Sequence, residues 1–207
     1  MSPTPATTLA FLLTLAGPLA AQRQKLPASP TVPAEALAGQ SVAVMPLTLV
    51  AAEPALESDT SYARYRDRQT TLLLADSLIG EALTGRAPEV QWVLPPTLRK
   101  LARRSPGIVG DPDQMGQAAL RAPKMKDIPD PLRSSLRKLV AVAGGRVAMV
   151  PAALAFGRES DGRIRADLTL VAADTRAGKV LWRSVAVGAG ATPREALQAA
   201  LTVALPL

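Results

Sequence analysis

The 207-residue sequence contains no cysteine and no histidine, and only 3% of its residues are aromatic. Without cysteine the chain has no disulfide, no thiol nucleophile, no thiolate ligand for zinc or iron–sulfur clusters, and no lipid-modified cysteine. Without histidine it has no serine–histidine–aspartate triad, no imidazole metal ligand and no imidazole base. Carboxylates, lysines and hydroxyls are the remaining reactive groups, so we expect no cofactor and no metal.

The length predicts one domain with a lead-in segment. The chain carries 24 lysines and arginines against 17 acidic residues, a net charge of +7. All of this excess lies between Pro96 and Arg146, where eleven residues are basic and four are acidic, whereas the rest of the chain has thirteen of each. The positive charge is therefore a property of one segment.

The first 21 residues have no charged side chain and resemble an export signal. An apolar run, Leu9–Ala16, is interrupted by Gly17–Pro18 and followed by small residues. This layout is typical of a secretory signal peptide with cleavage at Ala21–Gln22. The run is shorter than the ~20 apolar residues that a transmembrane helix needs. We therefore expect a periplasmic or secreted product.

Residues 22–40 contain Pro27, Pro30 and Pro33 among small and polar residues. Such spacing favours an extended linker. The sequence thus predicts three parts: a signal peptide over 1–21, a proline-rich linker over 22–40 and a single domain over 41–207.

The domain alternates between strand and helix patterns. Apolar or alternating stretches predict strands, and apolar residues at helical spacing predict helices. The expected strands cover 41–50, 90–94, 146–156, 163–174 and 179–188. The expected helices cover 69–83, 97–104, a short stretch at 115–120, a segment starting at 131 and a segment following 192. The order β-α-β-α-α-β-β-β-α predicts an α/β fold, a mixed sheet of about five strands flanked by helices.

Three local signals are the most specific in this pattern. Pro46 cannot donate to a strand ladder, so the first strand should end or bulge there. The sequence from Asp174 to Gly178 favours a hairpin turn, because aspartate opens turns and glycine adopts positive φ. Thr192 with Glu195 three residues later indicates a helix cap.

Two stretches of the sequence resemble a known kind of domain: the opening strand Val42–Leu47 and the closing unit Leu168–Arg183. The closing unit has an Asp-x-x-x-Gly-Lys turn and a tryptophan in its return strand. The chain resembles the α/β domain of the curli-secretion channel protein, of outer-membrane activators of peptidoglycan synthases and of the TolB N-terminal type. The first two groups are typically anchored through a cysteine, which this chain lacks. The resemblance implies a non-catalytic envelope domain that assembles with or regulates another protein.

Acidic residues offer little for catalysis. Asp111 and Asp113 share a loop, but the further oxygen ligands and the turn glycine of a calcium site are missing. Asp167 and Asp174 are seven residues apart on one strand, so their side chains point to opposite faces. A carboxylate-dependent hydrolase is therefore the weakest of the alternatives, and we assign no catalytic residue.

Basic residues at helical spacing form the one candidate surface. An ordinary solvated face is one explanation; the functional one is contact with lipid headgroups, a polyanionic glycan or an acidic protein. Nucleic acid is disfavoured, because the segment has no aromatic residue for stacking and follows an export signal. The candidate residues are Arg99, Lys100, Arg103, Arg104, Arg133, Arg137 and Lys138.

The favoured hypothesis is an exported, non-enzymatic α/β domain that acts through an envelope protein or an anionic envelope surface, as an assembly or regulatory accessory. No small-molecule substrate is evident, and the sequence leaves an oligomer open. The alternatives are a basic cytosolic nucleic-acid-binding protein and, less favoured, the hydrolase.

Overall fold

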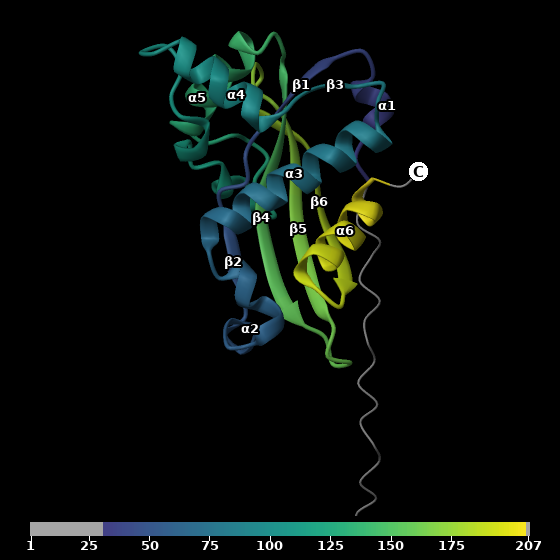
Figure 1. Ribbon diagram of the computed structural model, residues 1–207. Helices are drawn as coiled ribbons and strands as arrows, with labels where there is room; N and C mark the ends of the chain where they lie inside the picture. The colour runs from purple at the N-terminus through teal and green to yellow at the C-terminus, as the bar shows by residue number, and fades with distance from the viewer. Residues whose placement is uncertain (1–30, 206–207) are drawn as a thin grey trace, which may run out of the picture.

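A computed structural model describes residues 31–205 (Figure 1). The expected signal peptide, its cleavage site and residues 22–30 of the expected linker lie outside the described residues. The helices are α1 (Ala34–Leu37), α2 (Pro54–Glu57), α3 (Arg68–Arg86), α4 (Pro95–Arg104), α5 (Leu132–Val142) and α6 (Pro193–Ala204), with 3-10 helices η1 (Thr60–Tyr65), η2 (Pro112–Gln114) and η3 (Gln117–Arg121). The strands are β1 (Ser41–Val44), β2 (Val50–Ala52), β3 (Gln91–Val93), β4 (Val147–Arg158), β5 (Ile164–Asp174) and β6 (Lys179–Gly190).

The six strands form one mixed sheet in the order β3-β1-β4-β5-β6, and β2 pairs with β4. β1 runs parallel to both β3 and β4, β2 runs parallel to β4, and β4, β5 and β6 form an antiparallel meander. The predicted α/β class with a helix-flanked mixed sheet is confirmed. The strand number is six rather than about five, because the expected strand over 41–50 is divided into β1 and β2.

Pro46 lies in the break between these two strands, where the sequence predicts an interruption. The ladder to β4 continues for one more hydrogen bond, from the Met45 N–H to the Met149 carbonyl at 2.8 Å. Proline has no N–H to continue it. The chain then leaves the sheet and rejoins β4 at Val50, opposite Leu154.

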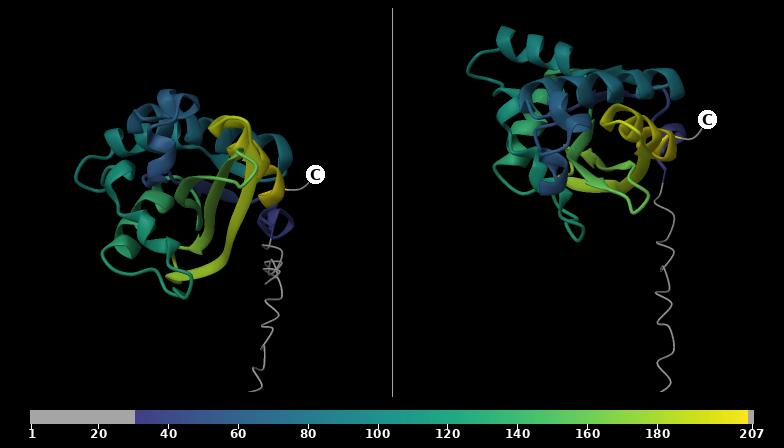
Figure 2. Two further views of the ribbon diagram at one scale, coloured as in Figure 1. Left: turned by 90° about the horizontal axis from the view of Figure 1, so that it is seen from below. Right: turned by 60° about the horizontal axis from the view of Figure 1, so that its bottom comes forward.

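Helices cover both faces of the sheet (Figures 1 and 2). Alternate residues of a strand point to opposite faces. In β4, Val147 and Met149 pack in the core cluster that includes α3 and α6, whereas Ala148 and Val150 pack in the cluster that includes α4 and α5. The helices of the basic segment, α4 and α5, therefore pack on one face of the sheet, and α3 and α6 pack on the other face.

Two local predictions at the C-terminal end are confirmed. The Asp174 carboxylate accepts hydrogen bonds from the Arg176 and Ala177 N–H groups, both at 2.9 Å, and so closes the β5–β6 turn. Gly178 has a φ of +73° there, which glycine adopts without a steric penalty. Thr192 caps α6 by accepting from the Glu195 N–H at 3.2 Å.

Residues 31–40 pack on the domain. Val32 and Leu37 are buried, and the Val32 N–H donates to the Ala204 carbonyl at 2.8 Å. The packed region therefore begins before residue 41, the boundary expected from the proline spacing. The proline content of a segment does not indicate whether its apolar residues, here Val32 and Leu37, are buried in the core.

Segment 105–130 holds two 3-10 helices, η2 and η3, in place of the single short helix expected at 115–120. The segment is fixed to the sheet by Arg183 of β6, which donates to the Leu120 carbonyl at 2.9 Å and the Met125 carbonyl at 3.1 Å. These contacts satisfy carbonyls that a proline-interrupted chain cannot pair in a regular helix.

Candidate functional site: the basic helices α4 and α5 and the cluster beneath them

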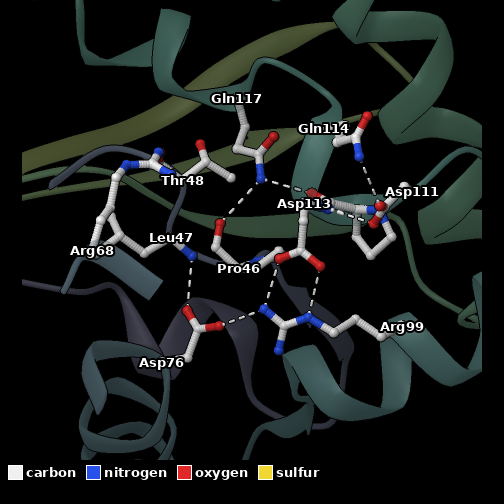
Figure 3. Close-up of polar contacts among 11 residues, drawn as sticks. Pro46, Leu47, Thr48, Arg68, Asp76, Arg99, Asp111, Asp113, Gln114 and Gln117 are labelled. Carbon is white, nitrogen blue, oxygen red and sulfur yellow. Dashed lines mark hydrogen bonds and ion pairs between the residues drawn. The ribbon is translucent and has the colours of Figure 1, made fainter. Parts of the chain in front are cut away.

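The break between β1 and β2 leaves backbone groups without ladder partners, and side chains from α3 and η3 supply them (Figure 3). The Asp76 carboxylate of α3 accepts from the Leu47 N–H at 2.8 Å. The Gln117 amide of η3 donates to the Pro46 carbonyl at 3.1 Å. Because buried backbone groups need partners, these side chains fix the course of the chain between β1 and β2.

Asp76 lies within the apolar stripe of α3 and is only 8% exposed. Its second oxygen accepts from the Arg99 guanidinium at 2.8 Å. Burial raises the pKa of the Asp76 carboxyl above its ordinary value, while its bonds to Leu47 and Arg99 lower it in part. A buried carboxylate of this kind is stable only with such partners.

Arg99 of α4 joins Asp76 of α3 to Asp113 of η2. Its Nε and Nη2 atoms donate to the two carboxylate oxygens of Asp113 at 2.8 and 2.7 Å, a bidentate arrangement. The bonds to Asp113, followed by those to Asp76, raise the pKa of Arg99. Its side chain is 20% exposed. One guanidinium therefore holds α3, α4 and the 105–117 loop together.

Two open cavities lie on either side of Arg99. One, of about 580 Å³, lies between α3 and the start of α4 and is lined by Leu73, Gly80 and Leu94 among others. The other, of about 430 Å³, is lined by Arg103 and Val109 among others. The cluster carboxylates that line them, Asp76 in the first and Asp113 in the second, are both ion-paired with Arg99.

Asp111 and Asp113 have different hydrogen-bond partners. Asp111 accepts from the N–H of Asp113 at 3.0 Å, while the Asp113 carboxylate is bound by Arg99. Over residues 31–205, no group of three or more acidic side chains is arranged to hold a metal ion. Asp167 is paired with Arg165 at 3.2 Å, far along β5 from the turn residue Asp174.

The structure separates the seven sequence-predicted basic residues into two kinds. Arg99 belongs to the internal cluster. The other six are exposed, and none of them forms an ion pair within residues 31–205. We call these six the α4–α5 basic surface: Lys100, Arg103, Arg104, Arg133, Arg137 and Lys138.

Helices α4 and α5 contact each other and lie on the same face of the sheet (Figure 1). Each buries an apolar stripe, with Leu98 and Ala102 in α4 and Leu136 and Leu139 in α5. The opposite, polar side of each helix carries the exposed cations. The α4–α5 basic surface is thus built on two packed helices and not on mobile loops.

Sequence reasoning missed Asp76 and Gln117 as members of the cluster. A signal for Asp76 exists: it follows Leu72 by four residues and precedes Ile79 by three, so it lies on the buried stripe of a helix. An aspartate at such a position requires a cationic or backbone partner. Gln117, which is fully buried, has no comparable pattern around it.

The fold and the site define an α/β domain with a basic helical face. No protein-family model and no curated protein matches the chain. Two solved structures of the PelC dodecamer from Paraburkholderia phytofirmans are similar to it in fold. A point variant has 14% identity over 86% of this chain and 92% of that chain, with a TM-score of 0.42. The other has 12% identity over 86% and 89%, with a TM-score of 0.36. At these scores neither likeness assigns a function.

Proposed function

We propose that this chain is an exported, non-enzymatic α/β domain that acts in the cell envelope by binding an anionic partner, as an assembly or regulatory accessory. The observation that carries the proposal is the α4–α5 basic surface. Six exposed cations without ion-pair partners within residues 31–205 lie on two adjacent helices. Such a concentration attracts anionic surfaces and raises association rates.

Export is the part of the proposal that rests on sequence alone. Residues 1–21 have the layout of a signal peptide, and no helix within residues 31–205 is long and apolar enough to cross a membrane. Cell fractionation followed by N-terminal sequencing should find a chain that begins at Gln22 outside the cytoplasm. A chain retained in the cytosol with Met1 intact would contradict export and favour the nucleic-acid alternative.

Anion binding is tested with vesicles that contain phosphatidylglycerol and, separately, with a soluble polyanionic glycan. We compare Arg103→Gln/Arg137→Gln, which removes one charge from each basic helix, with the matched control Arg64→Gln/Arg194→Gln. All four arginines are exposed, and both variants lower the net charge by two. At about 1 kcal/mol per cation near an anionic surface, the first variant should bind tenfold or more weakly, and the control within about twofold.

The ligand that shows this difference identifies the class of partner. Equal loss in both variants would show that total charge, and not the α4–α5 basic surface, governs binding, and would contradict the proposal. Binding to duplex DNA that is stronger than to either probe at the same salt would favour the nucleic-acid alternative. Light scattering on the same samples measures the mass of the protein in solution and so shows whether the chain forms an oligomer.

A further inference from the structure

The sheet has an unfilled position beside β2. Strands β1 and β2 both pair with the same side of β4, β1 opposite Val147–Met149 and β2 opposite Leu154–Phe156. On its other side β1 pairs with β3, whereas no strand within residues 31–205 occupies the corresponding position next to β2. A cavity of about 600 Å³ lies there, between the β2 edge and η1.

The backbone of β2 presents hydrogen-bonding groups to this cavity. The Leu49 carbonyl accepts from the Leu154 N–H at 3.0 Å, and the Glu53 N–H donates to the Phe156 carbonyl at 2.9 Å. Backbone groups alternate in direction along a strand. The N–H and C=O groups of Val50 therefore point away from β4, toward the cavity. Those of Ala52, two residues on, do the same, which makes β2 an open strand edge.

Aromatic residues form the wall opposite this edge. Tyr62 and Tyr65 line the cavity, with ring centroids 5.8 Å apart. The Tyr62 ring is buried and packs edge-on against Phe156, and its hydroxyl makes no hydrogen bond within residues 31–205. Burial, and secondarily Glu57, raise the pKa of Tyr62, so the hydroxyl remains a neutral donor. The wall combines apolar area with an available donor.

The rim of the cavity is more cationic than anionic. Arg66 and Arg68 are both exposed and form no ion pair within the described part of the chain. Each donates to a backbone carbonyl, Arg66 to Asp59 and Arg68 to Thr48. Among residues 31–205, Glu57 is the one acidic residue that lines the cavity. The charge at the rim therefore favours an acidic occupant.

We propose that this cavity binds an extended, acidic segment of a partner protein, which adds a strand to β2. The segment would hydrogen-bond to the backbone of Val50 and Ala52, place alternate side chains against the tyrosines and bring a carboxylate to Arg66 and Arg68. This mode of recognition gives affinity through the main chain and specificity through alternate side chains. The site is separate from the α4–α5 basic surface and does not depend on the function proposed for it.

The chain's own N-terminal segment is a poor occupant on chemical grounds. Residues 22–30 contain Arg23 and Lys25 and no acid, and Pro27 and Pro30 cannot donate to a ladder. The positive charges of this segment would be repelled by the arginines at the rim of the cavity. These features favour an acidic segment from another protein.

The test uses the full chain labelled with ¹⁵N and an acetylated peptide, Thr-Val-Thr-Val-Asp-Glu. Titration should shift the amide resonances of Val50 and Ala52. Arg66→Glu/Arg68→Glu should weaken binding about tenfold, the effect expected from reversing two exposed charges. The matched control Arg64→Glu/Arg194→Glu reverses the same number of charges at two exposed arginines that do not line the cavity, and it should bind within about twofold of the unaltered chain.

Two N-methylated versions of the peptide test strand pairing itself. Methyl groups on alternate amides block either the edge that would face β2 or the opposite edge. One version should lose binding and the other should retain it. Equal affinity of both versions, or absence of any shift at Val50 and Ala52 with about 1 mM peptide, would overturn the proposal. So would a shift confined to residues 22–30, because the acidic peptide would then bind that basic segment and not the cavity.

Discussion

The two sides of helix α4 contain the same residue type in opposite roles. On the inner side, Arg99 is bound by two carboxylates and is 20% exposed. On the outer side, Arg103 and Arg104 are exposed and form no ion pair within residues 31–205. The inner arginine holds the helix in place, and the outer ones are available to a partner. A run of basic residues in a sequence is therefore not one surface, because packing assigns each residue its own environment.

Substitutions on the two sides of α4 should differ in their effect on stability, and Arg99→Ala on the inner side should cause the largest loss. It leaves Asp76 buried without its cation and releases Asp113, so we expect the free energy of unfolding to fall by about 2–4 kcal/mol. Arg103→Ala, on the outer side, should change it by less than about 0.5 kcal/mol. Urea denaturation of both variants measures the difference. Equal effects would show that Arg99 is not part of a structural cluster.

Asp76→Asn and Asp113→Asn compare the two carboxylates that bind Arg99. Asparagine at 76 keeps an oxygen for the Leu47 N–H but loses the charge, so we expect a loss of about 1–2 kcal/mol. Asp113 has a side chain 39% exposed, and its substitution should cost less than about 1 kcal/mol. The same unfolding assay applies. A larger loss at position 113 would show that Asp113, and not the buried Asp76, is the more important partner of Arg99.

Asp174 at the β5–β6 turn contrasts with Asp76 in its pH response. Hydrogen bonds from Arg146, followed by backbone N–H groups, lower the pKa of Asp174 below its ordinary value of 3.8. The folded state therefore favours the ionised carboxylate. Its contribution to stability is complete above the unfolded pKa and is lost as the pH falls through the lowered folded pKa.

The difference in unfolding free energy between the unaltered chain and Asp174→Asn should be about 1 kcal/mol at pH 6, and smaller at pH 2–3. Arg146→Gln, which removes the main cause of the lowered pKa, should flatten this pH dependence. A difference that stays constant across this range would show that the Asp174 pKa is not lowered in the folded chain.

The elements that the sequence predicts are those fixed by short-range rules. The Asp174–Gly178 turn, the Thr192 cap and the interruption at Pro46 each depend on a few neighbouring residues. Strand β2 has only three residues, too few for a periodic pattern, and it forms because β4 offers it an edge. The inward position of Arg99 depends on Asp76 and Asp113, which lie 23 and 14 residues away. Partners at that distance are set by the tertiary fold.

We propose that the outer side of α4 binds an anionic partner, while its inner side only holds the helix in place. The most direct measurement is the affinity of Lys100→Gln/Arg103→Gln/Arg104→Gln for phosphatidylglycerol vesicles at low salt, with the unfolding free energy measured on the same protein. We predict an affinity about a hundredfold lower, since each cation contributes about 1 kcal/mol, and an unfolding free energy within about 0.5 kcal/mol of the unaltered chain. An unchanged affinity in a variant that remains folded would contradict the claim.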